Sequence, residues 1–489
     1  MTASPSVWPV SRRYAWVVFA LSFGLLLSDY MSRQVLNAVF PMLKAEWLLS
    51  DAELGSLSGV VALTVGVLAF PLSLLADRWG RVRSLLIAAT VWSLATLGCA
   101  VSAGYGEMMT GRLFVGIGEA AYGSVGIAVV LSVFPPVLRA TLSGAFIAGG
   151  AFGSVLGVSI GGAVAEAFGW RWAFGVMGVF GLVFAACYGV VVTEKRLRPR
   201  AETDADRRNA ADTDPDTRNA ADTDPDTRNA ADTDPDTRNA ADTDAATGAR
   251  PEADTIEDAA TAPREHLRAL LPRLFSSVSV IGAYVGSGLQ LFIAGALIAW
   301  LPSYFDRYYH LPTAQAGAAA GVFALVIGVG MIGGGIVSDR ISKARPIRKW
   351  SVAIVCSLGS LVLLLTAFHL PIGSLQIMTL AAGAVLSAGT AGPAAAMVAN
   401  LTPATIAATA FATLTLANSL LGLAPGPAVT GMLADRTSLL DALRLVPLVA
   451  LVATVAFVVG RHHYERDLLR ITELSGPAGP ERTRTEVSS

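Results

Sequence analysis

The sequence predicts an all-α membrane protein in which twelve transmembrane helices form two bundles of six. Hydrophobic residues make up 53% of the 489-residue chain and charged residues 15%, whereas soluble proteins average about 25% charged residues. Apolar runs recur along the chain, and runs of about 20 residues cross a bilayer as helices. They are too long and too uniformly apolar for barrel strands. A short polar pattern also occurs twice, 262 positions apart, as Asp77-Arg78 and Asp339-Arg340.

Each predicted span is an apolar run bounded by polar residues or prolines. In chain order the spans cover residues 14–40, 52–76, 83–103, 107–134, 138–165, 171–193, 274–305, 313–338, 347–368, 372–399, 404–433 and 437–461. The first run is too long for the hydrophobic part of a cleavable signal peptide. The expected organisation is an N-terminal six-helix bundle, a cytoplasmic linker, a C-terminal six-helix bundle and a cytoplasmic tail, at residues 1–193, 194–273, 274–461 and 462–489.

An acidic repeat fills much of the linker. The ten residues from Asn209 recur in tandem to Arg238, and residues 201–262 hold 18 acidic residues and six arginines. The repeat lacks aromatic and large aliphatic residues, so it cannot bury a core and we expect it to be disordered. A binding tail is one interpretation. A tandem expansion in a tolerant linker is the interpretation we favour.

Lys and Arg gather in one set of loops, and cytoplasmic loops carry such an excess. Both termini and the linker are therefore expected in the cytoplasm. The loops on this side carry Arg12, Arg13, Arg78, Arg81, Arg83, Arg139, Lys195, Arg196, Arg340, Lys343, Arg345, Arg348 and Lys349. The opposite loops carry Lys44, Arg171, Arg307 and Arg436.

The repeated Asp-Arg pattern indicates two similar halves joined in tandem. Such repeats are typical of secondary transporters, whose binding site lies between the repeats. A carboxylate at the end of one helix can pair with Arg and cap the N-terminus of a neighbouring helix. We therefore predict a conformational latch, and its members are Asp77, Arg78, Arg81, Asp339 and Arg340. Anchoring by positive charge alone is the alternative.

Away from the ends of the predicted spans, the N-terminal half holds four charged residues, namely Asp29, Arg33, Arg112 and Glu119. Charges at membrane depth are costly and mark function by default. The members of each pair share a helix face, because they are four and seven positions apart. Arg33 and Arg112 are predicted to bind an anionic substrate. Glu119 or Asp29 would take up a proton and so free an arginine. Two ion pairs that only lock helices together are the alternative.

The predicted spans of the C-terminal half hold no charge at membrane depth. Gln290 and Asn418 are polar there, and we predict that they contact the substrate. The three cysteines fall inside apolar runs and are expected to be core residues, without disulfides or a metal site. The spans show no nucleophile–base pair, and the chain shows no phosphate-binding glycine loop followed by Lys-Ser/Thr. We therefore expect no enzymatic activity and no cofactor.

Glycine spacing adds two expectations. Glycines recur every fourth residue from Gly149 to Gly161, which predicts a smooth ridge for close helix contact. A seam on which the halves rock and ordinary tight packing are both open interpretations of this ridge. Glycines and prolines between Gly422 and Gly431 predict a bend in the span at residues 404–433.

These motifs resemble those of the major facilitator superfamily over nearly the whole chain outside the linker and tail. Residues 73–83 and 335–349 look like that family's cytoplasmic loop signature and its echo in the second half, with Ser73 where the signature has Gly. Residues 112–120 look like its helix-four motif, whose Arg is associated with proton coupling. The resemblance implies two six-helix bundles, alternating access powered by the proton gradient, and a monomer.

Residues 29–36, 112–120 and 170–174 are similar to motifs of Spinster-like transporters and of the anion:cation symporters. Those groups usually have Asp immediately before the first-helix Arg. Ser32 occupies that place here, and Asp29 lies one turn earlier. The proton-coupling role that the resemblance implies therefore shifts toward Glu119.

Our hypothesis from the sequence is that the protein is a proton-coupled secondary active transporter that moves a small organic anion across a bacterial inner membrane by alternating access. Its expected partners are the small-molecule substrate, protons and the lipid bilayer, without nucleic acid. Export of an amphiphilic, lipid-like or drug substrate is the alternative, because the C-terminal half is charge-free at membrane depth. A membrane sensor without transport is a remote third possibility.

Overall fold

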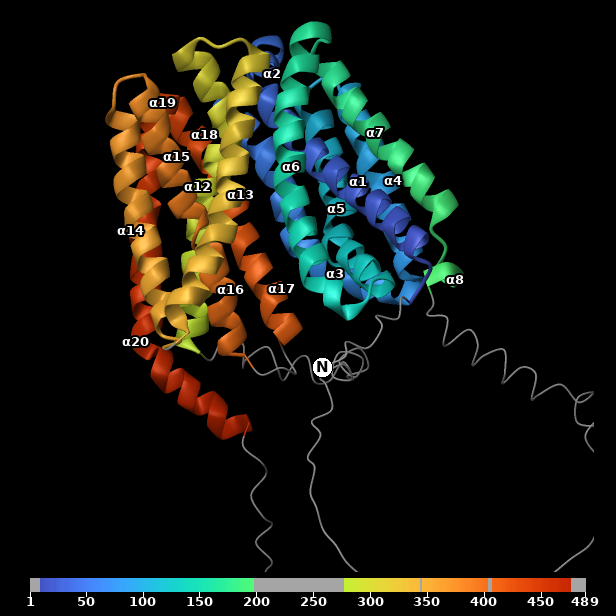
Figure 1. Ribbon diagram of the computed structural model, residues 1–489. Coiled ribbons are helices and arrows are strands. Elements are labelled where there is room, and N and C mark those ends of the chain that lie inside the picture. The colour runs from blue at the N-terminus through green and yellow to red at the C-terminus, as the bar shows by residue number, and fades with distance from the viewer. Residues whose placement is uncertain (1–8, 198–276, 344, 403–406, 476–489) are drawn as a thin grey trace, which may run out of the picture.

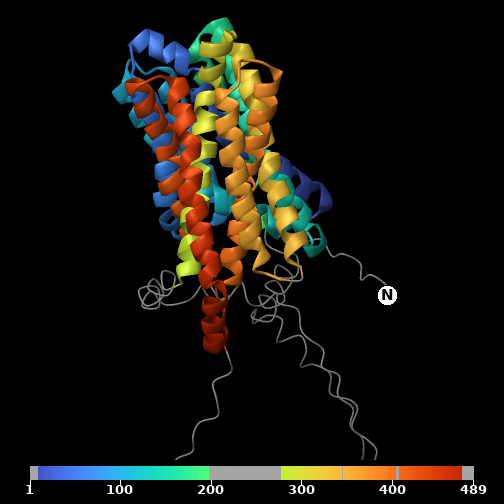
Figure 2. The same cartoon turned by 90° about the vertical axis from the view of Figure 1, so that its left-hand side faces the viewer.

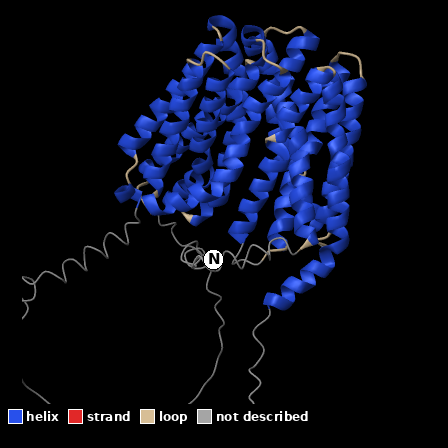
Figure 3. Ribbon diagram, turned by 180° about the vertical axis from the view of Figure 1, so that it is seen from behind, coloured by secondary structure: helices blue, strands red, loops and turns tan. Residues whose placement is uncertain are grey.

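The structure is a computed structural model that describes residues 9–197, 277–343, 345–402 and 407–475. Every regular element in these residues is helical (Figure 3), which confirms the predicted all-α class. The expected linker falls almost wholly outside the described residues, and the interpretations of its acidic repeat stay predictions.

The N-terminal half contains six long helices and two short ones. The long helices are α1 (Arg12–Ala38), α3 (Asp51–Trp79), α4 (Arg81–Ala100), α5 (Tyr105–Val133), α6 (Pro136–Phe168) and α7 (Trp170–Val191). The short helices are α2 (Phe40–Trp47) and α8 (Glu194–Leu197). Helix α2 was not predicted. Its first turn contains Pro41, and Val39 is both the C-cap of α1 and the N-cap of α2.

The C-terminal half repeats this pattern with more interruptions. Its unbroken crossings are α12 (Val278–Tyr309), α13 (Thr313–Ser342) and α14 (Arg348–His369). The three later crossings are divided into α15 (Ser374–Ala388) and α16 (Ala391–Asn400), α17 (Ala407–Asn418) and α18 (Pro425–Arg436), and α19 (Leu439–Leu445) and α20 (Val449–Ser475). Figure 2 shows α20 extending below the other helices, past residue 461, where the tail was expected to begin.

Eleven helical segments of the described chain are long and apolar enough to cross a membrane. The remaining expected crossing is the one for which a bend was predicted. There α17 leads into a π-helical turn, Ser419–Leu423, before α18 begins at Pro425. The glycines and prolines of this segment therefore account for the break between α17 and α18.

The two ends of the molecule are named here by their loops. The Asp-Arg end carries the loops between α3 and α4 and between α13 and α14, and the α2 end carries α2. In Figure 1 the α2 end is at the top, and α1 and α7 lean away from α14 and α20 toward the Asp-Arg end.

The predicted glycine ridge packs inside one half. A Cβ atom added at Gly153 would lie 2.8 Å from the Cβ of Tyr30, and one at Gly157 would lie 2.7 Å from the Cα of Met31. Both neighbours belong to α1, so the ridge joins α6 to α1 within the N-terminal half. Of the two interpretations left open, ordinary tight packing is therefore the one that the structure shows.

Other glycines allow the two halves to touch. Helix α3 packs on α18, and α6 packs on α13. A Cβ atom at Gly55 would lie 2.3 Å from the main-chain oxygen of Pro427, and one at Gly317 would lie 2.6 Å from that of Val158. Such contacts lie between the α2 end and the middle of the helices, at Gly55, Gly59, Gly66, Gly162, Gly317, Gly321, Gly328 and Gly431.

Candidate functional site: buried charges in the N-terminal half and the closed α2 end

An ion pair joins α1 to α5 in the interior of the N-terminal half. Arg33 donates to Oε2 of Glu119 from Nε at 3.0 Å and from Nη2 at 2.5 Å. The Glu119 side chain is fully buried, whereas 22% of the Arg33 side chain is exposed. The guanidinium also lies 5.5 Å from the ring centre of Tyr30. Arg33 is therefore the more exposed member of this pair.

Asp29 adds a second carboxyl group to the pair. It lies one turn before Arg33 and interacts electrostatically with both Arg33 and Glu119. One oxygen of each carboxyl group, Oδ1 of Asp29 and Oε1 of Glu119, is buried and has no hydrogen-bond partner among the residues that the structure describes. Two carboxyl groups and one guanidinium thus share a buried site. From their spacing we expected Asp29, Arg33, Arg112 and Glu119 to meet in the N-terminal bundle. The structure brings Asp29, Arg33 and Glu119 together.

Arg112 has a different environment. Its side chain is fully buried, and it donates to the main-chain oxygens of Ser32 at 2.9 Å, Arg33 at 3.1 Å and Leu57 at 3.4 Å. These carbonyl groups belong to α1 and α3. The guanidinium therefore fastens three helices together beside the charged site, and its predicted contact with an anion stays a prediction.

The two polar candidates of the C-terminal half lie apart from the charges. Gln290 donates to Oγ of Ser357 at 2.5 Å, and its Oε1 accepts from Ser387 at 3.1 Å. Its amide is thus used between α12, α14 and α15. Asn418 ends α17, and its buried Oδ1 has no hydrogen-bond partner within the described part of the chain. Asn418 therefore offers an unused acceptor, and Gln290 does not.

The predicted latch residues lie at the Asp-Arg end. Arg78, Arg81 and Arg340 are exposed, and Asp339 lies 3.7 Å from Lys349 of the same half. The side chain of Asp77 is outside what the structure describes. The carboxylate that caps a helix here is Glu194, which accepts from the main-chain N–H groups of Arg81 at 3.0 Å and Val82 at 3.3 Å.

Sequence reasoning missed Glu194 because it was assigned to the linker. The usable signal was an acidic residue placed directly after the sixth span. The latch role of the five predicted residues stays a prediction for another conformation of the protein.

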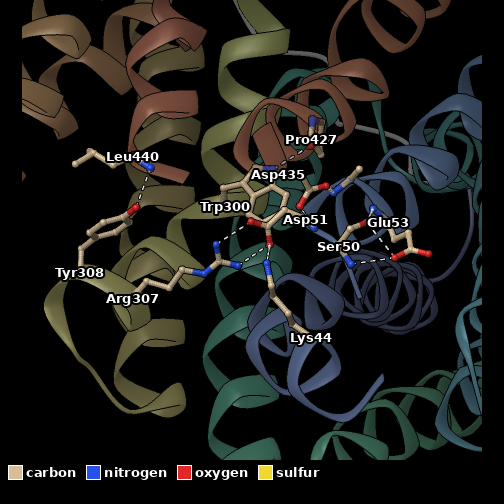
Figure 4. Close-up of polar contacts among 11 residues, drawn as sticks. Lys44, Ser50, Asp51, Glu53, Trp300, Arg307, Tyr308, Pro427, Asp435 and Leu440 are labelled. Atoms are coloured by element: carbon tan, nitrogen blue, oxygen red, sulfur yellow. Dashed lines mark hydrogen bonds and ion pairs between the residues drawn. The ribbon is translucent and has the colours of Figure 1, made fainter. Parts of the chain in front are cut away.

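Polar contacts between the halves occur at the α2 end (Figure 4). Asp51 begins α3 and is only 3% exposed. Its carboxylate accepts from Arg307 of α12 at 2.6 and 2.9 Å and from Lys44 of α2 at 2.6 Å. Asp435 of α18 accepts from the main-chain N–H groups of Asp51 at 2.7 Å and Ala52 at 2.8 Å. These contacts close the α2 end between α3, α12 and α18.

A further carboxylate at this end binds within its own half. Glu46 of α2 accepts from Nε1 of Trp170 at 2.6 Å and from Arg171 at 2.7 Å, both in α7. These two donors hold the pKa of the Glu46 carboxyl below its usual range. Glu46 therefore stabilises the N-terminal half without joining it to the other.

Among the described residues, no group of three or more His, Cys, Asp or Glu side chains could hold a metal ion. The site contains one partly exposed guanidinium, that of Arg33, and two buried carboxyl groups, those of Asp29 and Glu119.

Comparison with known proteins gives the family. The model of the Major Facilitator Superfamily matches residues 22–427. The hexuronate transporter of Bacillus subtilis is 26% identical over 179 residues, which are 37% of this chain and 42% of that protein. Protein spinster homolog 3 of Danio rerio is 28% identical over 182 residues, 37% of this chain and 36% of that protein. Each alignment thus spans less than half of the relative.

A crystal structure shows the same fold. It is that of a bacterial homolog to the human lysosomal transporter Spinster, in an inward-facing and unoccupied conformation. The TM-score is 0.73 at 18% sequence identity, over 94% of this chain and 99% of that one. The predicted resemblance, in fold and in motifs, is therefore confirmed, and this chain is a multi-pass membrane protein that belongs to the major facilitator superfamily.

Proposed function

We propose that this protein is a proton-coupled transporter of a small organic anion that works by alternating access. The observation that carries the proposal is the Arg33–Glu119 pair, in which a buried carboxylate occupies a cation that is partly exposed. An incoming carboxylate or similar anion competes with Glu119 for the guanidinium, because Arg binds such groups through two parallel hydrogen bonds.

The neighbouring carboxyl groups supply the coupling. With both Asp29 and Glu119 ionised, two buried carboxylates compete for one guanidinium, that of Arg33, because the Arg112 guanidinium is bound to main-chain oxygens. A single proton held between the carboxyl groups relieves their mutual repulsion. The proton neutralises the carboxyl group that the substrate displaces from Arg33, so proton and anion enter the site together. When the proton leaves, Glu119 recovers Arg33 and expels the anion.

Loop charge supports an orientation in the membrane, and the contacts between the halves support a conformation. Lys and Arg in the loops of the Asp-Arg end support a cytoplasmic location for that end in a bacterial cell. The polar contacts that join the halves at the α2 end support a conformation closed to the outside. Names among the relatives, which include a hexuronate transporter, support an organic anion as the substrate class.

Uptake into proteoliposomes tests the proposal, with a panel of sugar acids and other carboxylates as candidate substrates. Arg33→Gln should abolish uptake of the transported anion. Arg171→Gln is the matched control, because Arg171 pairs with a carboxylate at the exposed surface of the same half, and it should transport normally. Normal uptake by Arg33→Gln would contradict the assigned role of Arg33.

Export of an amphiphile is the second candidate. In the described C-terminal half, Gln290 is already bound by serines, which leaves an apolar interior suited to an apolar substrate. Growth on a substrate and resistance to a toxic compound distinguish the two candidates. An expression strain that gains resistance without gaining uptake of any anion would favour export.

A further inference from the structure

Two helix contacts, called seams here, join the halves: α3 with α18 and α6 with α13. At the α2 end, each seam contains a carboxylate that caps a helix. At the seam of α3 and α18, the Asp435 carboxylate accepts from the first two N–H groups of α3. At the seam of α6 and α13, Oε2 of Glu166 accepts from the N–H of Ala314 in the first turn of α13 at 2.7 Å. Each carboxylate thus caps a helix that belongs to the opposite half.

Both capped helices need this partner. The first four N–H groups of a helix have no acceptor within the helix. In α3, Oγ of Ser50 accepts from Glu53 at 3.2 Å, and the N–H groups of Asp51 and Ala52 bind Asp435. Helix α13 follows Pro312, whose side chain makes no cap hydrogen bond. Glu166 provides α13 with a capping oxygen that its own sequence lacks.

The two carboxylates are unfavourably placed in their own helices. Glu166 and Asp435 lie in the last turns of α6 and α18, where the helix dipole repels negative charge. The first turn of another helix attracts it. The repulsion from its own helix acts on each carboxylate in both arrangements, whereas the contact with the other helix exists only in the closed one. Separation of the halves at the α2 end therefore loses two favourable contacts, and this loss favours the closed arrangement.

The two caps are related by the tandem organisation of the chain. Helices α3 and α13 are the second crossings of their halves. Helices α6 and α18 belong to the fifth crossings. In both seams a carboxylate at the end of a fifth crossing caps the start of a second crossing. The same arrangement occurs at both seams with different residues. Helix capping is therefore a shared feature of the two contacts that close the α2 end.

We propose that Glu166 and Asp435 form a paired latch that holds the α2 end closed and that must release both helices before this end opens. The proposal rests on the alternating access of the proposed function, but not on its substrate or on proton coupling. It differs from the latch that the sequence predicts, because its residues lie at the opposite end of the molecule. The two latches would then stabilise opposite conformations.

Distance measurement between spin labels tests the paired latch directly. The labels are placed at Val101 and Ile372, which are exposed at the α2 end of the two halves, after replacement of the three native cysteines by alanine. Purified full-length protein is measured without substrate at one pH. The ratio of long to short distances then reports the fraction of molecules open at this end.

Glu166→Ala and Asp435→Ala should each raise the open-to-closed ratio about three- to tenfold, the size of a typical cap effect at an exposed position. The double variant should raise it by about the product, roughly tenfold to a hundredfold, since the two caps lie on separate seams. Glu166→Gln and Asp435→Asn keep an acceptor oxygen but lose the charge, so they should give smaller increases. They also replace the alanine variants if those fail to fold.

Glu46→Ala is the matched control, because Glu46 is a carboxylate of the same end that binds within one half. It should leave the ratio unchanged. Unchanged distances in the double variant, or an equal shift with Glu46→Ala, would overturn the paired latch. Opening by the latch variants in a protein that moves neither anions nor protons would keep the latch and reject the proposed function.

Discussion

At the scale of single residues, two arginines that the sequence treats alike have different surroundings. Arg33 bonds to a carboxylate and is partly exposed. Arg112 bonds to three main-chain oxygens and is fully buried. Spacing on a helix predicts which residues share a face, but the partner of each side chain depends on neighbouring helices. These contacts support a functional role for Arg33 and a structural role for Arg112.

This difference predicts how Arg112→Ala behaves. Removal of the guanidinium leaves buried carbonyl groups of α1 and α3 without their donor, and the free energy of unfolding should fall by about 3 kcal/mol or more. Thermal unfolding in detergent measures the loss. Arg171→Ala, which removes an exposed guanidinium, should cost less than about 1 kcal/mol. An Arg112→Ala protein of normal stability with a raised KM would instead make Arg112 a substrate ligand.

Some features of the Asp29 and Glu119 carboxyl groups could not be predicted from the sequence. Asp29 lies one turn before the position that similar proteins use, and only the packing of α1 on α5 shows that it still reaches Glu119. The unpartnered oxygens of both groups are a feature of the folded protein. No sequence pattern predicts an unsatisfied atom, because its neighbours come from distant parts of the chain.

At the scale of helices, glycines decide how closely elements approach. The ridge on α6 contacts the backbone of α1, and a side chain at Gly157 would have to push Met31 aside. Gly175 of α7 has no atom within 4 Å of an added Cβ. The two glycines are both in helix interiors, so they differ in their surroundings and not in local conformation.

This contrast gives a paired prediction. Gly157→Ala should lower the unfolding temperature, because overpacking in a tight contact costs about 1–3 kcal/mol. Gly175→Ala should be neutral or raise it, since Ala is favoured over Gly within a helix by about 0.5–1 kcal/mol. Differential scanning fluorimetry in one detergent compares the two. Equal effects in both variants would mean that the α1–α6 contact is not tight.

Element boundaries show where sequence reasoning stops. The number of crossings and the bend at Ser419–Leu423 were predictable, because apolar length and proline positions are local properties. Helix α2 and the division of α15 from α16 were not predicted. Helix α2 is short and contains Lys44 and Glu46, and α15 and α16 are separated only by Gly389 and Thr390, which keep helical backbone angles, so hydropathy gives no signal at either place.

At the scale of the whole molecule, the two halves have similar topology but carry different chemistry. The charged site lies in the N-terminal half, whereas the described buried residues of the C-terminal half are apolar apart from serines, threonines, amides such as Gln290, and Asp467 near the Asp-Arg end. The tandem pattern predicted the two halves. It also predicted that carboxylates would cap helices, although the caps between the halves are found at the α2 end. The location of these caps depends on residues that are far apart in the sequence, such as Asp435 and Asp51, which are 384 residues apart.

The central claim is that anion movement and proton movement share the Asp29–Arg33–Glu119 site, and proton flux in proteoliposomes tests it most directly. Addition of a transported anion to vesicles that hold a pH-sensitive dye should move protons in the wild type. Glu119→Gln should abolish this movement, and Glu46→Gln, which alters a carboxylate outside the site, should not. Anion uptake without proton movement in the wild type, or unchanged proton movement in Glu119→Gln, would contradict the claim.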